Sequence, residues 1–138
     1  MIRTYIDAGV LFWAHHGKPA LAVKAMGILD DANREFVSSV FLRLETLPKA
    51  VFHKNRDEVS FYEAFFDGVK EWAAPLDAII QEAHQESCRL GLGTIDALHV
   101  AAAMLMHADE LVTTEKPTKP IHRVTSLKVI SLHSIDEI

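Results

Sequence analysis

The chain has 138 residues, the size of a single domain spanning residues 1–138, and 49% of them are hydrophobic, enough to bury a core without disulfides. Its 19 acidic residues outnumber its 14 basic ones, and the net charge of −5 argues against a protein that coats nucleic acid through bulk charge. The single cysteine, Cys88, excludes an intramolecular disulfide and a multi-cysteine zinc site, and we interpret it as a packed thiol.

The N-terminal segment and the apolar pattern predict a soluble, cytoplasmic protein. Asp7 falls within the first apolar run, which is not typical of a signal peptide. No apolar stretch is long enough to span a membrane, so we expect no membrane contact. A lone cysteine also fits a reducing compartment.

The first predicted element is a strand. Residues 2–6 are β-rich and short, and the strand is expected to end at Asp7. The chain is then expected to turn before a helix that begins at Pro19. That helix is expected to end at residues 30–33, where polar residues interrupt the apolar repeat.

A second strand and two helices are expected next. Residues 36–39 look like a strand whose serines can cap the following helix, residues 40–52, which Pro48 interrupts. Asp57 is expected to cap another helix, because apolar residues recur at helical spacing as far as residue 69.

Two more helices are predicted after Pro75. The first is amphipathic and ends near residues 91–93, where two glycines are typical of a helix stop. Thr94 is expected to cap the second, residues 94–107, which is apolar on most of its sides. We therefore expect this last helix to lie at the centre of the fold.

The C-terminal part predicts two strands, residues 111–114 and 129–132, with a loop over residues 117–120 between them. Strands that alternate with helices favour an α/β fold with a parallel sheet and right-handed crossovers. Ligands of such sheets collect beyond the carboxyl ends of the strands. Functional side chains are therefore expected at that edge.

Four carboxylates are expected to converge there. Asp7 follows the first strand, and Glu115 follows a later one. Asp96 lies in the first turn of the apolar helix, and Glu45 lies about one turn into the helix that begins where the second strand stops. Each of these residues is a candidate metal ligand.

Convergent carboxylates repel one another and raise each other's pKa unless a cation compensates them. Mg²⁺ or Mn²⁺ accepts oxygen ligands and often uses only one or two carboxylates together with substrate phosphate. Such an ion activates water and neutralises charge during phosphodiester hydrolysis, so no covalent nucleophile is needed. The pattern therefore favours metal-dependent phosphodiester chemistry.

Each carboxylate also has a structural interpretation. Asp7 can end a strand in an Asx turn, and Asp96 can stabilise the start of a helix through the macrodipole. Glu45 can be a solvated helical residue, and Glu115 can form an exposed pair with Lys116. Metal binding and helix stabilisation can coexist.

The chain resembles the PIN-domain nucleases, and in particular the VapC-type toxins. The resemblance covers essentially the whole chain, and its most specific segment is the alanine-rich helix that Asp96 opens. Four segments carry it: TYID at residues 4–7, SSVFLRLE at 38–45, GLGTIDALHVAAA at 91–103 and LVTTE at 111–115.

This resemblance implies a three-layer α/β/α sandwich with a short central parallel sheet and a Mg²⁺- or Mn²⁺-dependent ribonuclease activity. It also implies a homodimer and inhibition by a cognate antitoxin. Asp7, Glu45 and Asp96 match the acidic positions of the family. Glu115 stands where Asp is more usual, and Gly9 stands where the family commonly has Ser or Thr.

The candidates for substrate binding are basic. His99 can contact a phosphate or orient Asp96, although a structural histidine is the commoner outcome on an apolar helix. Arg43, Lys116 and Lys119 can hold the RNA backbone without reading bases. His122 and Arg123 lie in the same part of the chain, and a solvated charged loop is the alternative.

The leading hypothesis is an endoribonuclease that acts as the toxin of a toxin–antitoxin pair. The competing hypothesis is a catalytically weakened PIN-like module that binds RNA or a protein. A third is a metal-dependent phosphatase or DNA nuclease, because the same electrostatics stabilise other phosphoryl transfers.

Overall fold

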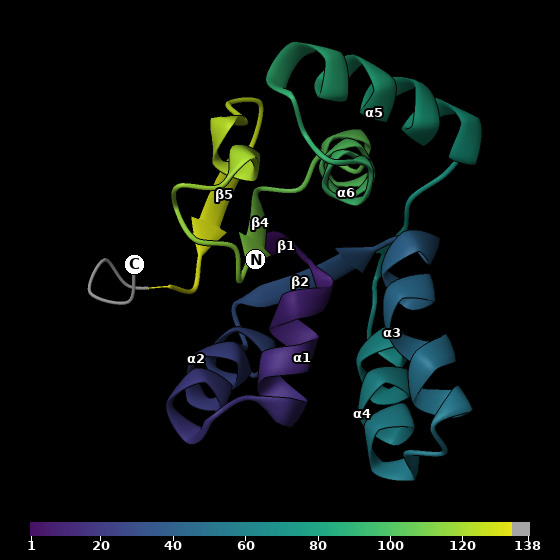
Figure 1. Cartoon of the computed structure of the whole chain (residues 1–138), viewed down its shortest axis with the longest axis vertical. Coiled ribbons are helices and arrows are strands. Elements are labelled where there is room, and N and C mark those ends of the chain that lie inside the picture. The colour runs from purple at the N-terminus through teal and green to yellow at the C-terminus, as the bar shows by residue number, and fades with distance from the viewer. Residues whose placement is uncertain (134–138) are drawn as a thin grey trace.

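The computed structural model describes residues 1–133, which form a five-stranded parallel sheet between two layers of helices (Figure 1). The strands lie in the order β3-β2-β1-β4-β5, and every neighbouring pair is parallel. Their bounds are β1 (Ile2–Ile6), β2 (Arg34–Ser38), β3 (Glu71–Trp72), β4 (Glu110–Thr113) and β5 (Lys128–Ser131).

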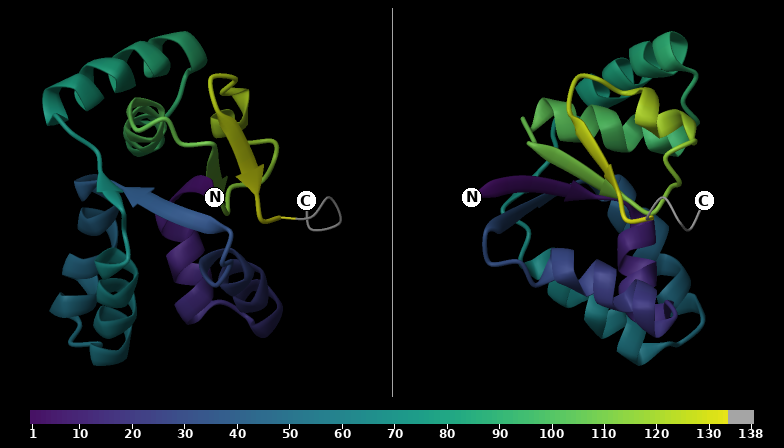
Figure 2. Two further views of the ribbon diagram at one scale, coloured as in Figure 1. Left: turned by 180° about the vertical axis from the view of Figure 1, so that it is seen from behind. Right: turned by 90° about the vertical axis from the view of Figure 1, so that its left-hand side faces the viewer.

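The helices cover both faces of the sheet, as the two views of Figure 2 show. One face carries α1 (Ala8–His16), α2 (Pro19–Leu29), α3 (Val40–Phe52) and α4 (Arg56–Asp67). The other carries α5 (Leu76–Leu90) and α6 (Thr94–Leu105), and a short 3₁₀ helix, η1 (Pro120–Arg123), precedes β5. The expected three-layer α/β/α sandwich is therefore confirmed.

Strand alternation builds a separate core on each face of the sheet. Tyr5 pairs in register with Leu111, and both are fully buried in the cluster under α5 and α6. Ile6 pairs with Val112, and both are buried in the cluster under α1, α3 and α4. Successive strand residues point to opposite faces, so both faces of the central strands are apolar.

The prediction that the chain turns between Asp7 and Pro19 is wrong, because residues 8–16 form α1. Asp7 is the N-cap of this helix, and its side chain accepts a hydrogen bond from the backbone N–H of Val10. The helix is apolar on most sides, so its sequence carries almost no helical periodicity.

Two predicted caps are also wrong. Ser39 precedes α3, but its hydroxyl pairs with the Tyr5 hydroxyl at 2.6 Å and makes no capping bond. Asn55, and not Asp57, caps α4, since its side-chain oxygen accepts a hydrogen bond from the Glu58 N–H at 3.2 Å. A polar side chain close to a helix start thus has several possible hydrogen-bond partners, and the sequence alone does not show which of them it bonds.

The predicted Thr94 cap is wrong as well. Thr94 is the first residue of α6, and Gly93 occupies the N-cap position without a side-chain bond. The expectation that α6 is central is confirmed, since most of its residues from Ala97 to Ala103 are buried. The preceding helix stops as predicted at Gly91, whose φ of 69° lies in the left-handed region.

Three smaller features differ from expectation. Pro48 lies inside α3 without ending it, and the two-residue edge strand β3 was not predicted. Cys88 is exposed rather than packed, and its sulfur lies 3.7 Å from Nε2 of His84 one turn earlier on α5.

Among residues 1–133, no single helix is long and apolar enough to cross a membrane. The helices α5 and α6 meet that criterion only when they are taken together, and their axes differ by 119°.

Candidate active site

The candidate site lies where the central strands end. Parallel β1, β2 and β4 lead into Asp7, Ser39 and Thr114 at one edge of the sheet. The chain passes from β1 to β2 on one side, and β4 pairs with β1 on the other, so this edge is the switch point of the sheet. A pocket of about 250 Å³ opens there.

All four predicted carboxylates line this one pocket. They come from the start of α1, from α3, from the first turn of α6 and from the segment after β4. The complete lining is Asp7, Ala8, Gly9, Phe12, Glu45, Ile95, Asp96, His99, Thr114 and Glu115. The expected convergence of acidic side chains from remote parts of the chain therefore occurs.

Asp7 is the most constrained of the four. Its side chain is buried, with 7% of the residue exposed. The Thr113 hydroxyl donates to its Oδ2 at 2.5 Å, and the Val10 N–H donates to its Oδ1 at 3.4 Å. Asp7 thus caps α1 and faces the pocket at the same time, so its structural and functional interpretations are compatible.

Burial makes Asp7 and Asp96 harder to ionise than free carboxylates. Burial raises the pKa of Asp7 to about 6, with a further contribution from the charge of Asp96, although Thr113, His99 and Val10 act in the opposite direction. The pKa of Asp96 is also raised, first by burial and then by the charge of Glu115. The pocket therefore holds negative charge that the side chains around it do not fully compensate.

A buried chain of hydrogen bonds ends at Glu45. The Ser39 and Tyr5 hydroxyls lie 2.6 Å apart, and the Tyr5 hydroxyl lies 2.6 Å from Nδ1 of His99. Nε2 of the same imidazole bonds to Oε1 of Glu45. A carboxylate only accepts, so Nε2–H donates to Glu45. Nδ1 accepts the Tyr5 proton when the ring is neutral and donates to the Tyr5 oxygen when the ring is charged.

This chain fixes Glu45 from the centre of the molecule. His99 is 1% exposed, and Tyr5 is fully buried. The pKa of Tyr5 lies far above its ordinary value, mainly because of burial, so the phenol remains protonated and can donate to His99. His99 therefore orients Glu45, rather than Asp96 as one of the sequence hypotheses had it.

Sequence reasoning missed three residues that position the carboxylates, namely Tyr5, Ser39 and Thr113. Tyr5 and Thr113 are strand residues whose polar atoms reach the carboxyl edge of the sheet. A hydroxyl next to each acidic motif, as in TYID and LVTTE, is the signal that was present in the sequence.

Thr114 occupies the space beside Gly9. A Cβ atom added at Gly9 would lie 1.9 Å from Oγ1 of Thr114 and 3.0 Å from its Cβ. Gly9 is therefore required by close approach of another residue. The hydroxyl that residue 9 lacks is present in the same space on Thr114.

The predicted substrate-binding cations lie outside the pocket lining. The Arg43 guanidinium lies over the ring of Phe66, 5.6 Å from its centroid. Arg123 donates to the backbone oxygen of Leu90 at 2.8 Å and so supports the turn after α5. Lys116 and Lys119 are exposed on the loop that follows Glu115.

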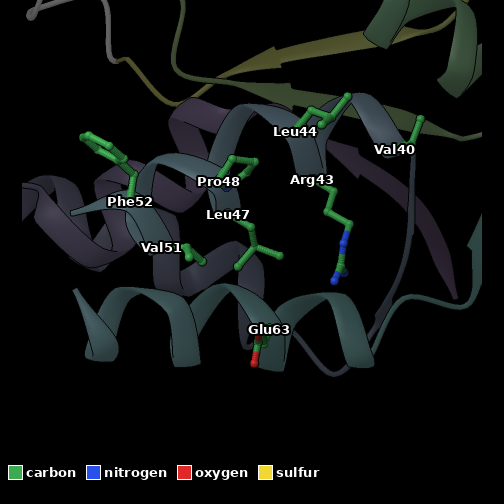
Figure 3. A pocket seen from close by; sticks show the side chains of 8 residues that line it. All are labelled: Val40, Arg43, Leu44, Leu47, Pro48, Val51, Phe52 and Glu63. Atoms are coloured by element: carbon green, nitrogen blue, oxygen red, sulfur yellow. The ribbon is translucent and has the colours of Figure 1, made fainter. Parts of the chain in front are cut away.

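An apolar groove runs between α3 and α4, and Figure 3 shows the side chains that line it. Its volume is about 670 Å³. Leu44, Val51 and Phe52 project from α3, and they are 63%, 57% and 78% exposed. Arg43 and Glu63 are the charged residues of its lining.

Comparison with known proteins gives the family. The PIN domain family model matches residues 4–117. The chain belongs to the PIN-domain family, whose members are nucleases. No curated protein sequence matches the chain.

Solved structures with a similar fold include toxin–antitoxin complexes. A toxin–antitoxin complex from Klebsiella pneumoniae aligns with a TM-score of 0.70 at 17% identity, covering 96% of this chain and 99% of that one. VapBC2 from Rickettsia felis, bound to a DNA fragment from its promoter, aligns with a TM-score of 0.68 at 15% identity, covering 94% and 98%. DNA-bound VapBC from Salmonella typhimurium aligns with a TM-score of 0.68 at 14% identity, covering 96% and 100%.

The residues of the pocket fit a hard divalent cation. Four carboxylates offer oxygen ligands, which Mg²⁺ and Mn²⁺ prefer. The raised pKa values of Asp7 and Asp96 reflect burial and mutual repulsion, both of which a bound cation would offset. Asp7, Glu45, Asp96 and Glu115 are the residues that can hold it directly or through water.

Proposed function

We propose that the protein is a divalent-metal-dependent endoribonuclease that uses Mg²⁺ or Mn²⁺. The observation that carries this proposal is the pocket at the sheet switch point, which four carboxylates from four separate segments line. Membership of the PIN-domain family supports the nuclease class. The choice of RNA as substrate rests on the resemblance to VapC-type toxins.

The side chains of the pocket are prepared for this chemistry before substrate arrives. Thr113 and Val10 fix Asp7, and His99 fixes Glu45. Asp96 and Glu115 add negative charge to the pocket. When bound, the ion supplies charge neutralisation and an activated water for phosphodiester hydrolysis.

The exposed loop after Glu115 is the proposed contact with the RNA backbone. Lys116 and Lys119 are exposed there and can neutralise phosphates without reading bases. Arg43 is not proposed for this role, since its guanidinium lies against Phe66 in the apolar groove.

A cleavage assay on a broad RNA panel tests the proposal. We expect cleavage with Mg²⁺ or Mn²⁺ and none in excess EDTA. Asp96→Asn should reduce the rate by about a hundredfold or more, because it removes a proposed ligand from the ion. Asp67→Asn, at an exposed position on α4, is the matched control and should leave the rate unchanged.

Two other functions remain as outcomes of this assay. Metal-independent RNA binding without cleavage would favour a weakened PIN-like binding module. Gly9 and Glu115, which depart from the residues usual in the family, are the reason to consider that module. Cleavage of DNA or of small phosphate esters in preference to RNA would favour the DNA nuclease or phosphatase. Full RNA cleavage in EDTA would contradict all three metal-dependent activities.

We further propose that the partner of this chain is an antitoxin, with an apolar segment of it seated in the α3–α4 groove. Three structures that share the fold are complexes of a toxin with its antitoxin. Leu44, Val51 and Phe52 form an exposed apolar surface beside this groove. A contiguous exposed apolar patch of this kind is typical of a protein-binding surface.

The product of a gene adjacent to that of this chain is the probe for the groove. Leu44→Asp combined with Phe52→Asp should weaken its binding by about a hundredfold, because two apolar anchors become charged. Cleavage by the free double variant should persist. If the substitutions instead dissociate a dimer of this chain alone, the groove binds a second copy and the antitoxin assignment is wrong. The expected homodimer and cytoplasmic location stay predictions.

A further inference from the structure

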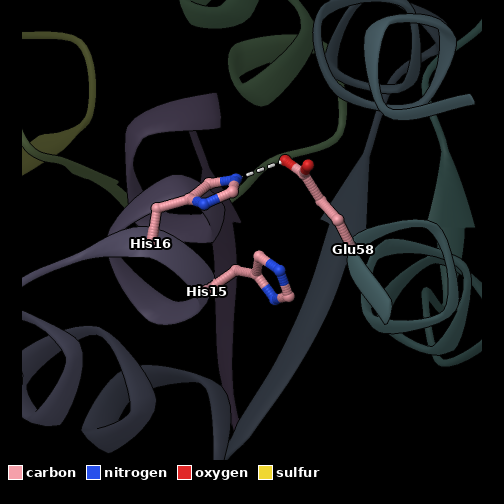
Figure 4. A group of neighbouring side chains, drawn as sticks. All are labelled: His15, His16 and Glu58. Carbon is pink, nitrogen blue, oxygen red and sulfur yellow. Dashed lines mark hydrogen bonds and ion pairs between the residues drawn. The ribbon is translucent and has the colours of Figure 1, made fainter. Parts of the chain in front are cut away.

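A second group of metal-binding side chains lies outside the carboxylate pocket, where the end of α1 meets the start of α4 (Figure 4). It consists of His15, His16 and Glu58. One ligand atom from each residue lies within 4.8 Å of the other two. Two helices that are remote in sequence therefore supply two imidazoles and a carboxylate to one place.

Glu58 is held in a fixed orientation. Its side chain is only 13% exposed. The Tyr62 hydroxyl donates to its Oε2 at 2.5 Å, and the Asn55 side-chain nitrogen donates to its Oε1 at 3.1 Å. Nε2 of His16 lies 2.6 Å from the same Oε2. Such hydrogen bonds from outer residues are what orient a carboxylate ligand toward a metal ion.

The two histidines differ in their freedom. The ring of His15 packs against Phe61 and Tyr62, with ring centroids 5.7 and 6.2 Å away, and it stands edge-on to His16 at 4.6 Å. The His16 side chain is 50% exposed. One imidazole is thus placed by packing, and the other leaves the cluster open to an ion from solvent.

We propose that His15, His16 and Glu58 form a binding site for Zn²⁺ or a similar transition-metal ion. Two histidine nitrogens and a glutamate oxygen are a ligand set that Zn²⁺ uses in proteins, with water at the remaining position. Mg²⁺ and Mn²⁺ prefer oxygen ligands, so the two sites differ in the metal they select. On binding, the His16 ring carries its proton on Nδ1, and its Nε2 exchanges Glu58 for the ion.

The cluster lies beside the candidate active site, so a bound ion would affect the structure there. A pocket of about 370 Å³ adjoins it, and His16, Glu58, Phe12 and Glu45 are among its lining residues. Phe12 and Glu45 also line the carboxylate pocket. Zn²⁺ would therefore tie α1 to α4 directly beside the candidate active site.

Calorimetric titration of the full chain with Zn²⁺ in the presence of excess Mg²⁺ tests the site. All variants carry Cys88→Ser, which removes a competing sulfur near His84. We expect one equivalent of Zn²⁺ to bind, and His16→Gln and Glu58→Gln each to weaken it by about tenfold or more. His15→Phe should also weaken Zn²⁺ binding by about tenfold or more, and it should preserve the ring contacts with Phe61 and Tyr62. The exposed His84→Gln is the matched control.

Asp96→Asn separates this site from the carboxylate pocket. Zn²⁺ binding that survives Asp96→Asn but is lost in His16→Gln supports the cluster. Binding that is lost in Asp96→Asn and unchanged in the histidine variants overturns it, as does the absence of any binding. Co²⁺ gives a second readout, since its absorption bands should appear in the Cys88→Ser protein and disappear in His15→Phe. Circular dichroism verifies that His15→Phe is folded.

Discussion

At the scale of single residues, the ionised Asp7 carboxylate lowers the stability of the metal-free fold. Its carboxylate is buried, and its pKa is raised to about 6 from an ordinary value near 3.8. A pKa raised in the folded state means that ionisation costs stability. This penalty is absent below about pH 4, where the group is protonated in both states. It grows between about pH 4 and pH 6 and approaches its full size above about pH 6.

Asp7→Asn should therefore stabilise the metal-free protein at pH 7, by an amount of up to about 3 kcal/mol given about 1.4 kcal/mol for each pKa unit. Urea unfolding in EDTA, at pH values from 4 to 7, is the measurement. The native protein should lose stability over that interval more steeply than the variant does. Equal slopes for the two proteins would show that Asp7 ionises without cost.

Gly9 is constrained by its contact with Thr114. Gly9→Ala places a Cβ 1.9 Å from Oγ1 and 3.0 Å from Cβ of Thr114, so rotation of the threonine side chain does not remove the overlap. We expect a loss of about 1–3 kcal/mol, as in other overpacked sites. Thr114→Ala in the same chain should recover part of that loss. Chemical denaturation of the two single variants and the double variant measures it, and strictly additive effects would contradict the contact.

The sequence identified the acidic residues but not the residues that hold them. Asp7, Asp96 and Glu115 stood out because each follows a strand or opens a helix, and parallel strands bring such positions to one edge. Glu45 lies about one turn into the helix after the second strand and stood out mainly through the resemblance to the PIN-domain family. Tyr5 and Thr113 did not stand out, because a polar atom at a strand position looks like an ordinary β residue. Their roles depend on distances between β1, β4 and α6 that only the folded chain defines.

At the scale of elements, the polar network joins β1, α3 and α6 across the core. Tyr5→Phe would leave the Ser39 hydroxyl and Nδ1 of His99 without their shared partner in a buried place. An unsatisfied buried polar group costs about 1–3 kcal/mol. We expect a loss of stability in this range and slower RNA cleavage, since His99 would hold Glu45 less firmly.

A second substitution separates the two effects of Tyr5→Phe. Adding Ser39→Ala removes one of the unpaired groups, so the double variant should be more stable than the sum of the single variants predicts. Cleavage should not recover with it, because His99 still lacks its partner. Thermal unfolding and cleavage rates of the four proteins in this cycle test the network, and full additivity in stability would contradict it.

Helix α1 shows why some elements escape sequence analysis. Its residues lie among α2, α3, α4 and β4, so most sides are apolar and no amphipathic stripe appears. The helices α2, α4 and α5 cover the sheet from outside, and their stripes predicted them with nearly correct bounds. Periodicity therefore located these three helices and missed α1, which packs among other elements.

At the scale of the whole molecule, the order of the strands creates the pocket. Because β1 lies between β2 and β4, Asp7 emerges at the centre of the sheet, with α3 arriving from one side and Glu115 from the other. The alternation of strands and helices was enough to predict a parallel sheet and its functional edge. The sequence did not predict the edge strand β3, because two residues are too few to show an alternation of apolar and polar side chains.

The account depends on a divalent cation binding in the pocket that the four carboxylates line, and titration with Mn²⁺ tests this most directly. The native chain should bind Mn²⁺, and Asp7→Asn, Glu45→Gln, Asp96→Asn and Glu115→Gln should each weaken that binding, while the exposed Asp67→Asn should not. Electron paramagnetic resonance of free Mn²⁺ provides the readout. Unchanged Mn²⁺ affinity in both Asp7→Asn and Asp96→Asn would contradict the account.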